Sequence, residues 1–231
     1  VSPKARGLFH KAITASGPSA AVNKPMATAV KEGVQRLSLL DCPKGDGFLA
    51  CLRSKSADEV EQAIPPEGGL SGLTWAPVSD NIFLADSPAN LFKQGKAPKD
   101  ISMLYLVTKD EQMLVMSGNK LMDIDEDTYK EKVAGLIKSK SDLEKVLKQY
   151  DASKYPSPVY ALGDVLTDRD AKCSIRNEIR NLSKSGVKVY MSHFMAGRDE
   201  VPIMKPLGAY HTIDVEFVFF VDEGDEGLNE A

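Results

Sequence analysis

The largely apolar run at residues 101–107 limits what this chain can fold into more than any other segment. Such a run is typical of a strand buried on both faces, as in parallel sheets. Residues 8–15 and 187–194 are also predicted strands, and helical patterns separate all three. Strands separated by helices predict an α/β fold with a mostly parallel sheet, although about three strands are few for such a sheet.

Helices are predicted where apolar residues recur at helical spacing between start and stop residues. Residues 128–150 hold two such stretches, and residues 159–184 hold one long helix or a bent pair. The further signals are the spacing of Val30, Val34 and Leu37, the capping box Ser56 to Glu59 with its stop at Pro65-Pro66, the Ser87-Pro88 start with its stop at Gly95, and the Ser141 start of the second stretch in 128–150.

The composition is that of an ordinary globular protein, with 42% hydrophobic residues and a net charge of -4 over 231 residues. We expect one partial domain at residues 1–221 and an acidic, flexible tail at 222–231. Nucleic acid is not an expected partner because there is no basic excess, and no apolar run reaches the roughly 20 residues of a membrane span. No cofactor or metal site is expected. No signal peptide is visible, but the chain opens in mid-pattern at Val1, and we interpret it as a fragment.

Three cysteines are present. Cys42 and Cys51 bracket a short polar loop that could bring their Cα atoms within disulfide reach, but the spacing alone leaves a disulfide and two free thiols equally open. Cys173 is left over, so it is free or its partner lies outside this chain.

Two chemistry-bearing residues follow predicted strands. Glu111 lies just after the buried run, in Thr-Lys-Asp-Glu, and His211 lies in Gly-Ala-Tyr-His near the end of the chain. In one class of serine hydrolases, the three catalytic residues occur along the chain in the order nucleophile, acid, histidine. The acid and the histidine occur here in that order, but no Gly-x-Ser-x-Gly nucleophile elbow occurs anywhere in the chain.

These segments resemble the cholinesterase/carboxylesterase family (type-B carboxylesterases) of the α/β-hydrolase fold, in its middle-to-late portion only. Gln112 departs from the family pattern, which usually has Gly after the acid. The resemblance implies a Cys42–Cys51 disulfide. The segments that carry the resemblance are, in chain order, residues 2–13 (the stretch after the nucleophile elbow), 42–53 (a small disulfide loop), 75–88 (the segment before the acid strand), 109–111 (the acid motif) and 208–219 (the histidine motif).

The resemblance also implies roles for individual residues. His211 would be the general base and acid, and Glu111 the carboxylate that orients it, about 2.6–3.2 Å away at the C-terminal ends of the strands. Ser16 and Asp214 would support this pair. The matching positions of the acyl pocket are Ser71 and Leu73, and those of the aromatic residues that hold quaternary ammonium groups are Leu114 and Val115, which have no π face.

The resulting interpretation is a fragment of a serine carboxylesterase that hydrolyses small carboxylic esters through a Ser-Glu-His triad. Its nucleophile and oxyanion hole would lie outside this chain, so the isolated chain should be inactive. The alternatives are a non-catalytic cholinesterase-like adhesion or binding protein and an inactive truncated homologue. The implied disulfide favours a secreted or secretory-pathway protein, with weak support from the Asn181 sequon. The oligomeric state stays open.

Overall fold

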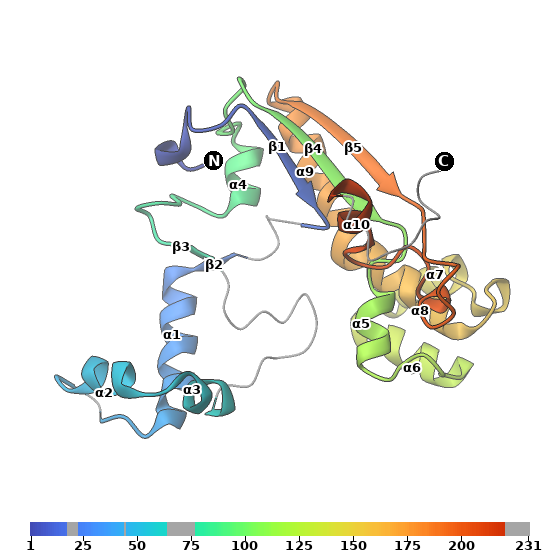
Figure 1. The fold of residues 1–231 in the computed structure, drawn as a ribbon, viewed down its shortest axis with the longest axis horizontal. Helices are drawn as coiled ribbons and strands as arrows, with labels where there is room; N and C mark the ends of the chain where they lie inside the picture. The colour runs from blue at the N-terminus through green and yellow to red at the C-terminus, as the bar shows by residue number, and fades with distance from the viewer. Residues whose placement is uncertain (18–22, 44, 64–76, 220–231) are drawn as a thin grey trace.

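A three-stranded parallel sheet, in the order β1–β4–β5, organises the computed structural model, which describes residues 1–17, 23–43, 45–63 and 77–219 (Figure 1). The strands are β1 (Lys11–Ala15), β4 (Ser102–Thr108) and β5 (Lys188–Phe194). The three predicted strands and their parallel arrangement are confirmed. The first strand is shorter than predicted and begins at Lys11, because its partner β4 begins opposite that residue, at Ser102.

The two faces of the sheet are covered very differently. Helix α9 (Cys173–Lys184) packs behind the sheet, and α4 (Pro88–Lys93) packs against α9 (Figure 1). This face carries Tyr105 and Val107, both fully buried in one apolar cluster with Ile175 and Leu182. The other face is open, since Ile13 and Tyr190 flank Leu104 in register and are 64% and 61% exposed.

A lobe of helices precedes β4 in the chain: α1 (Met26–Leu37), α2 (Phe48–Ser54) and α3 (Ala57–Ala63). The capping box is confirmed, because Ser56 and Glu59 each accept the other's backbone N–H at 3.2 and 2.8 Å. A short parallel pair, β2 (Lys24–Pro25) with β3 (Val78–Ser79), was not predicted.

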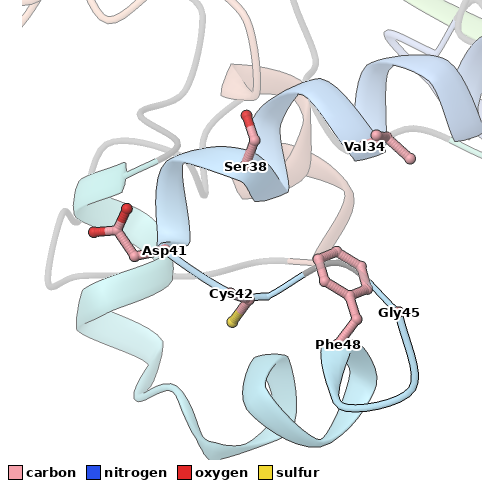
Figure 2. Close-up of a pocket in the computed structure, with 6 residues that line it drawn as sticks. All are labelled: Val34, Ser38, Asp41, Cys42, Gly45 and Phe48. Atoms are coloured by element: carbon pink, nitrogen blue, oxygen red, sulfur yellow. The ribbon is translucent and has the colours of Figure 1, made fainter.

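Cys42 and Cys51 form a disulfide with a Cα–Cα distance of 5.7 Å. A pocket of about 500 Å³ lies beside this bridge (Figure 2), lined by Val34, Ser38, Asp41, Cys42, Gly45 and Phe48.

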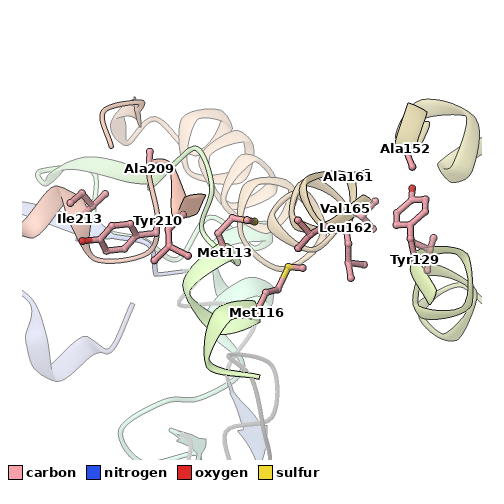
Figure 3. Close-up of a cluster of buried hydrophobic side chains, with 13 residues drawn as sticks. Met113, Met116, Tyr129, Ala152, Ala161, Leu162, Val165, Ala209, Tyr210 and Ile213 are labelled. Atoms are coloured by element: carbon pink, nitrogen blue, oxygen red, sulfur yellow. The ribbon is translucent and has the colours of Figure 1, made fainter. Parts of the chain in front are cut away.

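A second helical lobe follows β4, with α5 (Met113–Gly118), α6 (Glu126–Leu136), α7 (Lys140–Gln149) and α8 (Pro158–Thr167). Its core joins Met113 and Met116 of α5 to Leu162 of α8 (Figure 3). The predicted helical span, one long helix or a bent pair, is confirmed as α8 and α9 joined without a break by a π-helical turn (Asp168–Lys172). The prediction that Ser141 opens α7 is wrong, since the Ser139 hydroxyl accepts the Asp142 N–H and caps the helix two residues earlier.

The other short helices in the described part of the chain are the 3-10 turns Pro3–Ala5, Ser38–Leu40, Ala152–Lys154 and Lys205–Leu207, and α10 (Ile213–Phe219). The predicted helix after Ser87 is confirmed as α4, which Gly95 follows with φ of +70°. Within the described ranges, no helix combines the length and apolarity that crossing a bilayer requires. The acyl-pocket positions Ser71 and Leu73, the Pro65-Pro66 stop and the tail 222–231 lie outside the described residues.

The disulfide gives a first testable expectation. Thiol alkylation under denaturing, non-reducing conditions should modify only Cys173, which is exposed and free. Replacing both Cys42 and Cys51 by Ser should lower the free energy of unfolding by about 2–3 kcal/mol, because the bridge closes a short loop in the unfolded chain. Denaturant unfolding measures this loss, and Cys173→Ser is the matched control, expected within about 0.5 kcal/mol of the original protein. Three reactive thiols in oxidised material would contradict the bridge.

Candidate active site

The carboxylate of Glu111 is buried at the C-terminal edge of the sheet, in the turn that follows β4. Its Oε1 accepts the Ser16 hydroxyl at 2.6 Å and the backbone N–H of Thr108 at 2.7 Å. Its Oε2 lies 2.7 Å from Nδ1 of His211. The Glu111 side chain is buried, and three hydrogen-bond donors contact its two oxygens. A carboxylate held in this way has one fixed orientation.

His211 reaches this carboxylate from the loop after β5. Its side chain is about a quarter exposed, whereas that of Glu111 is 1% exposed. Because an ionised carboxylate only accepts hydrogen bonds, the ring nitrogen that faces it must be Nδ1–H. In the neutral imidazole, Nε2 is then the unprotonated nitrogen and is able to accept a proton.

The charges of the pair support each other. Burial raises the pKa of Glu111, but hydrogen bonds from His211, Ser16 and the Thr108 N–H outweigh it, so the net pKa lies below the ordinary value for glutamate. The hydrogen bond that His211 donates to Glu111 raises the pKa of His211 against the opposing effect of burial, and the negative charges of Glu111 and Asp214 add to the rise. The arrangement therefore favours an ionised carboxylate beside an imidazole that readily accepts a proton.

Ser16 belongs to the site through the backbone as well as through its hydroxyl. It follows β1 directly, is 8% exposed, and donates its N–H to the Leu106 carbonyl at 2.8 Å. Its φ of 52° lies in the left-handed region, which turns the chain away from the sheet and leaves the hydroxyl against Glu111. The structure therefore brings the side chains of Ser16, Glu111 and His211 together.

Asp214 lies on the first turn of α10 and is 1% exposed. Both carboxylate oxygens lack a hydrogen-bond partner among the described residues. Burial raises the pKa of Asp214, and the negative charge of Glu111 raises it further. Between His211 and α10, Thr212 has a φ of 79°, a left-handed conformation that β-branched residues rarely adopt.

The remaining sequence-predicted positions lie on the acid side of the site. Gln112 has a φ of -89°, so the turn after the acid does not require a glycine at this position. Leu114 and Val115 are half-buried on α5, which begins immediately after this turn.

Within the described residues, no group of His, Cys, Asp and Glu side chains is arranged to hold a metal ion. The pocket of Figure 2 belongs to the α1–α2 lobe, apart from the loop that carries His211 (Figure 1).

Sequence reasoning missed the contacts that hold the histidine loop and α10. Arg198 donates to Glu216 of α10 at 2.6 Å and to Glu200 at 2.8 Å. Phe194, at the end of β5, packs against Phe217 of α10 with ring centroids 5.0 Å apart. A loop arginine two residues before a glutamate was the available signal for part of this set, but its helical partner could not be inferred from spacing.

A parallel sheet with helices on one face, and with a histidine and a carboxylate beyond its strand ends, defines the α/β-hydrolase class in partial form. The chain belongs to the carboxylesterase family, whose sequence profile matches residues 1–228. It is 29% identical to a cholinesterase of Mus musculus over 94% of this chain and 39% of that protein. It is 24% identical to acetylcholinesterase 1 of Caenorhabditis elegans over 95% of this chain and 40% of that protein. An acetylcholinesterase of Gallus gallus is 37% identical over 38% of this chain and 12% of its own length. The chain thus spans about two fifths or less of these relatives.

The Ser16 hydroxyl gives a second expectation. Ser16→Ala should raise the pKa of Glu111 and lower the free energy of unfolding at neutral pH by about 1.5–3 kcal/mol, because a buried carboxylate loses a donor. The folded-state pKa of Glu111 is lowered, so this stabilisation is present above its unfolded pKa and disappears as the pH falls through the folded value. Denaturant unfolding at several pH values measures the difference.

The matched control is Ser2→Ala, because the Ser2 hydroxyl is also buried but has no hydrogen-bond partner in the described part of the chain. It should change the free energy of unfolding little at any pH. An equal and pH-independent loss in both variants would contradict the assigned Ser16–Glu111 bond.

Proposed function

We propose that this chain is part of a serine carboxylic-ester hydrolase in which His211 and Glu111 are two members of a Ser-Glu-His triad. The observation that carries the proposal is the 2.7 Å contact between His211 Nδ1 and a buried, ionised Glu111 carboxylate. Membership of the carboxylesterase family supports ester hydrolysis as the reaction class. The serine nucleophile and the oxyanion hole are proposed to lie in a part of the protein outside these 231 residues.

In this proposal Nε2 of His211 takes the proton of the serine hydroxyl as that oxygen attacks the ester carbonyl. It then returns the proton to the leaving alcohol, and the cycle repeats with water. Glu111 holds the Nδ1–H tautomer and stabilises the imidazolium that forms between the two transfers. Ser16 keeps the carboxylate fixed, and the negative charge of Asp214 adds to the stabilisation of the imidazolium. With the nucleophile proposed to lie outside these residues, the isolated chain is expected to be inert.

The proposed substrates are small, neutral carboxylic esters. Leu114 and Val115 occupy the positions that follow the acid, and neither offers a π face to a quaternary ammonium group. Ser71 and Leu73 are proposed to line a wide acyl pocket, because neither is aromatic. The Cys42–Cys51 disulfide and the cholinesterase relatives support a secretory origin.

Hydrolysis by the full-length protein is the decisive test. It should cleave short-chain nitrophenyl esters, and His211→Ala should lower kcat by roughly 10⁴- to 10⁶-fold. His211 acts as a base only when neutral, and Glu111 raises its pKa, so kcat/KM should fall as the pH drops through a value above the ordinary histidine pKa of about 6.5. Glu111→Gln should lower this midpoint as well as the rate.

The matched control is His10→Gln, which removes an exposed histidine at the opposite end of the sheet and should leave the pH profile unchanged. A folded full-length protein that neither hydrolyses esters nor reacts with a fluorophosphonate would contradict the proposal. That result would favour a non-catalytic adhesion or binding protein, or an inactive homologue.

Selectivity can be tested with two esters of the same shape. The kcat/KM values for butyrylcholine and for its uncharged isostere, 3,3-dimethylbutyl butyrate, should agree within about twofold. A cation–π contact worth about 0.5–2 kcal/mol would instead favour the choline ester roughly 2- to 30-fold. A strong preference for butyrylcholine would show that aromatic or acidic groups elsewhere in the protein recognise the cation.

A further inference from the structure

Beside the Glu111–His211 contact, Asp110 of the acid loop forms two hydrogen bonds with Ala209 of the histidine loop. The N–H of Asp110 donates to the Ala209 carbonyl at 2.9 Å, and the N–H of Ala209 donates to Oδ2 of Asp110 at 2.9 Å. We propose that Asp110 is a positioning residue whose carboxylate fixes the His211 loop against the Glu111 loop. This role in hydrolysis rests on the proposed function, but its effect on the imidazole can be measured separately.

The Asp110–Ala209 contact, formed by these two reciprocal bonds, lies very close to the reacting pair. Asp110 adjoins Glu111 in the chain, and only Tyr210 separates Ala209 from His211. Ala209 and Tyr210 are both buried, at 1% and 5% exposure, so the short connection cannot swing freely. The backbone bond alone would leave Ala209 held at its carbonyl only, and the Asp110 side chain supplies the second point that fixes its direction.

Two glycines show how tightly this contact is packed. Gly208 has a φ of 59°, and a Cβ at that position would clash with Oδ2 of Asp110. A Cβ on Gly197 would lie 2.9 Å from the Gly208 carbonyl oxygen. Gly197 therefore packs against the Gly208 backbone, and Gly208 packs against the Asp110 carboxylate. Such close approach on both sides is possible only because neither position has a side chain.

Several charged groups face the Asp110 carboxylate. Burial raises its pKa and the Asp164 charge adds to the rise, while the Ala209 N–H and the charges of Lys109 and Lys172 oppose it. Lys172 also donates to the Lys109 carbonyl at 3.0 Å, which ties the acid loop to the π-helical turn. The position of the carboxylate is thus set by backbone and charge on several sides, as a positioning role requires.

The test compares truncation with isosteric replacement in the full-length protein. Asp110→Ala should loosen the imidazole–carboxylate bond, so the pKa of His211 should fall towards the ordinary value and kcat should fall about 10- to 100-fold with little change in KM. Asp110→Asn keeps an oxygen that accepts the Ala209 N–H and should largely restore both quantities. The pKa is measured by NMR of labelled histidine rings, with the His211 signal assigned by its loss in His211→Gln.

The outcomes separate the possible roles. If Asp110→Asn behaves like Asp110→Ala, the negative charge acts rather than the hydrogen bond, and the positioning role is overturned. It is also overturned if Asp110→Ala leaves the His211 pKa and kcat unchanged. Should Asp110→Ala fail to fold, Asp110→Ser, whose hydroxyl is too short to reach Ala209, takes its place.

Asp80→Ala is the matched control, because Asp80 also accepts backbone N–H groups of a loop, those of Ile82, Phe83 and Leu84, away from the site. It should leave the His211 pKa unchanged even if it lowers stability. If the protein hydrolyses no ester at all, the NMR titration still decides the role of Asp110, so failure of this inference and failure of the proposed function are distinguishable.

Discussion

The arrangement of this chain around its site depends on one buried carboxylate. An ionised group in the interior is unfavourable unless hydrogen bonds replace its lost hydration. Glu111 meets this requirement with a hydroxyl after β1, a backbone N–H at the end of β4 and an imidazole from the loop after β5. Each donor comes from a different strand of the sheet or its following loop. The order β1–β4–β5 is therefore what allows one side chain to be satisfied from three directions.

The same requirement explains why the loops around Glu111 are rigidly built. The left-handed turn at Ser16, the close approach at Gly208 and the positive φ of Thr212 all place the chain in conformations that most residues avoid. Strain of this kind persists where the surrounding contacts fix the backbone strongly. Here the surrounding contacts are the Asp110–Ala209 bonds and the salt bridge from Arg198 to Glu216, which hold the loop before and the helix after His211.

The sequence predicted the parts of this structure that depend on local pattern. The apolar run at residues 101–107, the capping box at Ser56 and the start at Ser87 each follow from a few neighbouring residues. The pairing of Glu111 with His211 could be predicted only through resemblance, because the two lie 100 residues apart. The helix α10 could not be predicted, since its residues show no clear helical period and tertiary contacts decide its form. The burial of Asp214 depends on that helix and was equally hidden.

Asp214 and Glu111 show how one small region gives two chemically similar carboxyl groups different pKa values. Both carboxylates are buried and both are near the same imidazole, yet hydrogen bonds lower the pKa of Glu111 while burial raises that of Asp214. The difference lies in the donors, because Glu111 has three and the oxygens of Asp214 have none among the described residues. Environments that push the pKa values of neighbouring acids apart are characteristic of sites that move protons. In the proposed mechanism, an imidazole beside one ionised acid and one that protonates more easily retains a partner of fixed charge throughout the proton transfers, and this favours Glu111 over Asp214 as the proposed orienting carboxylate.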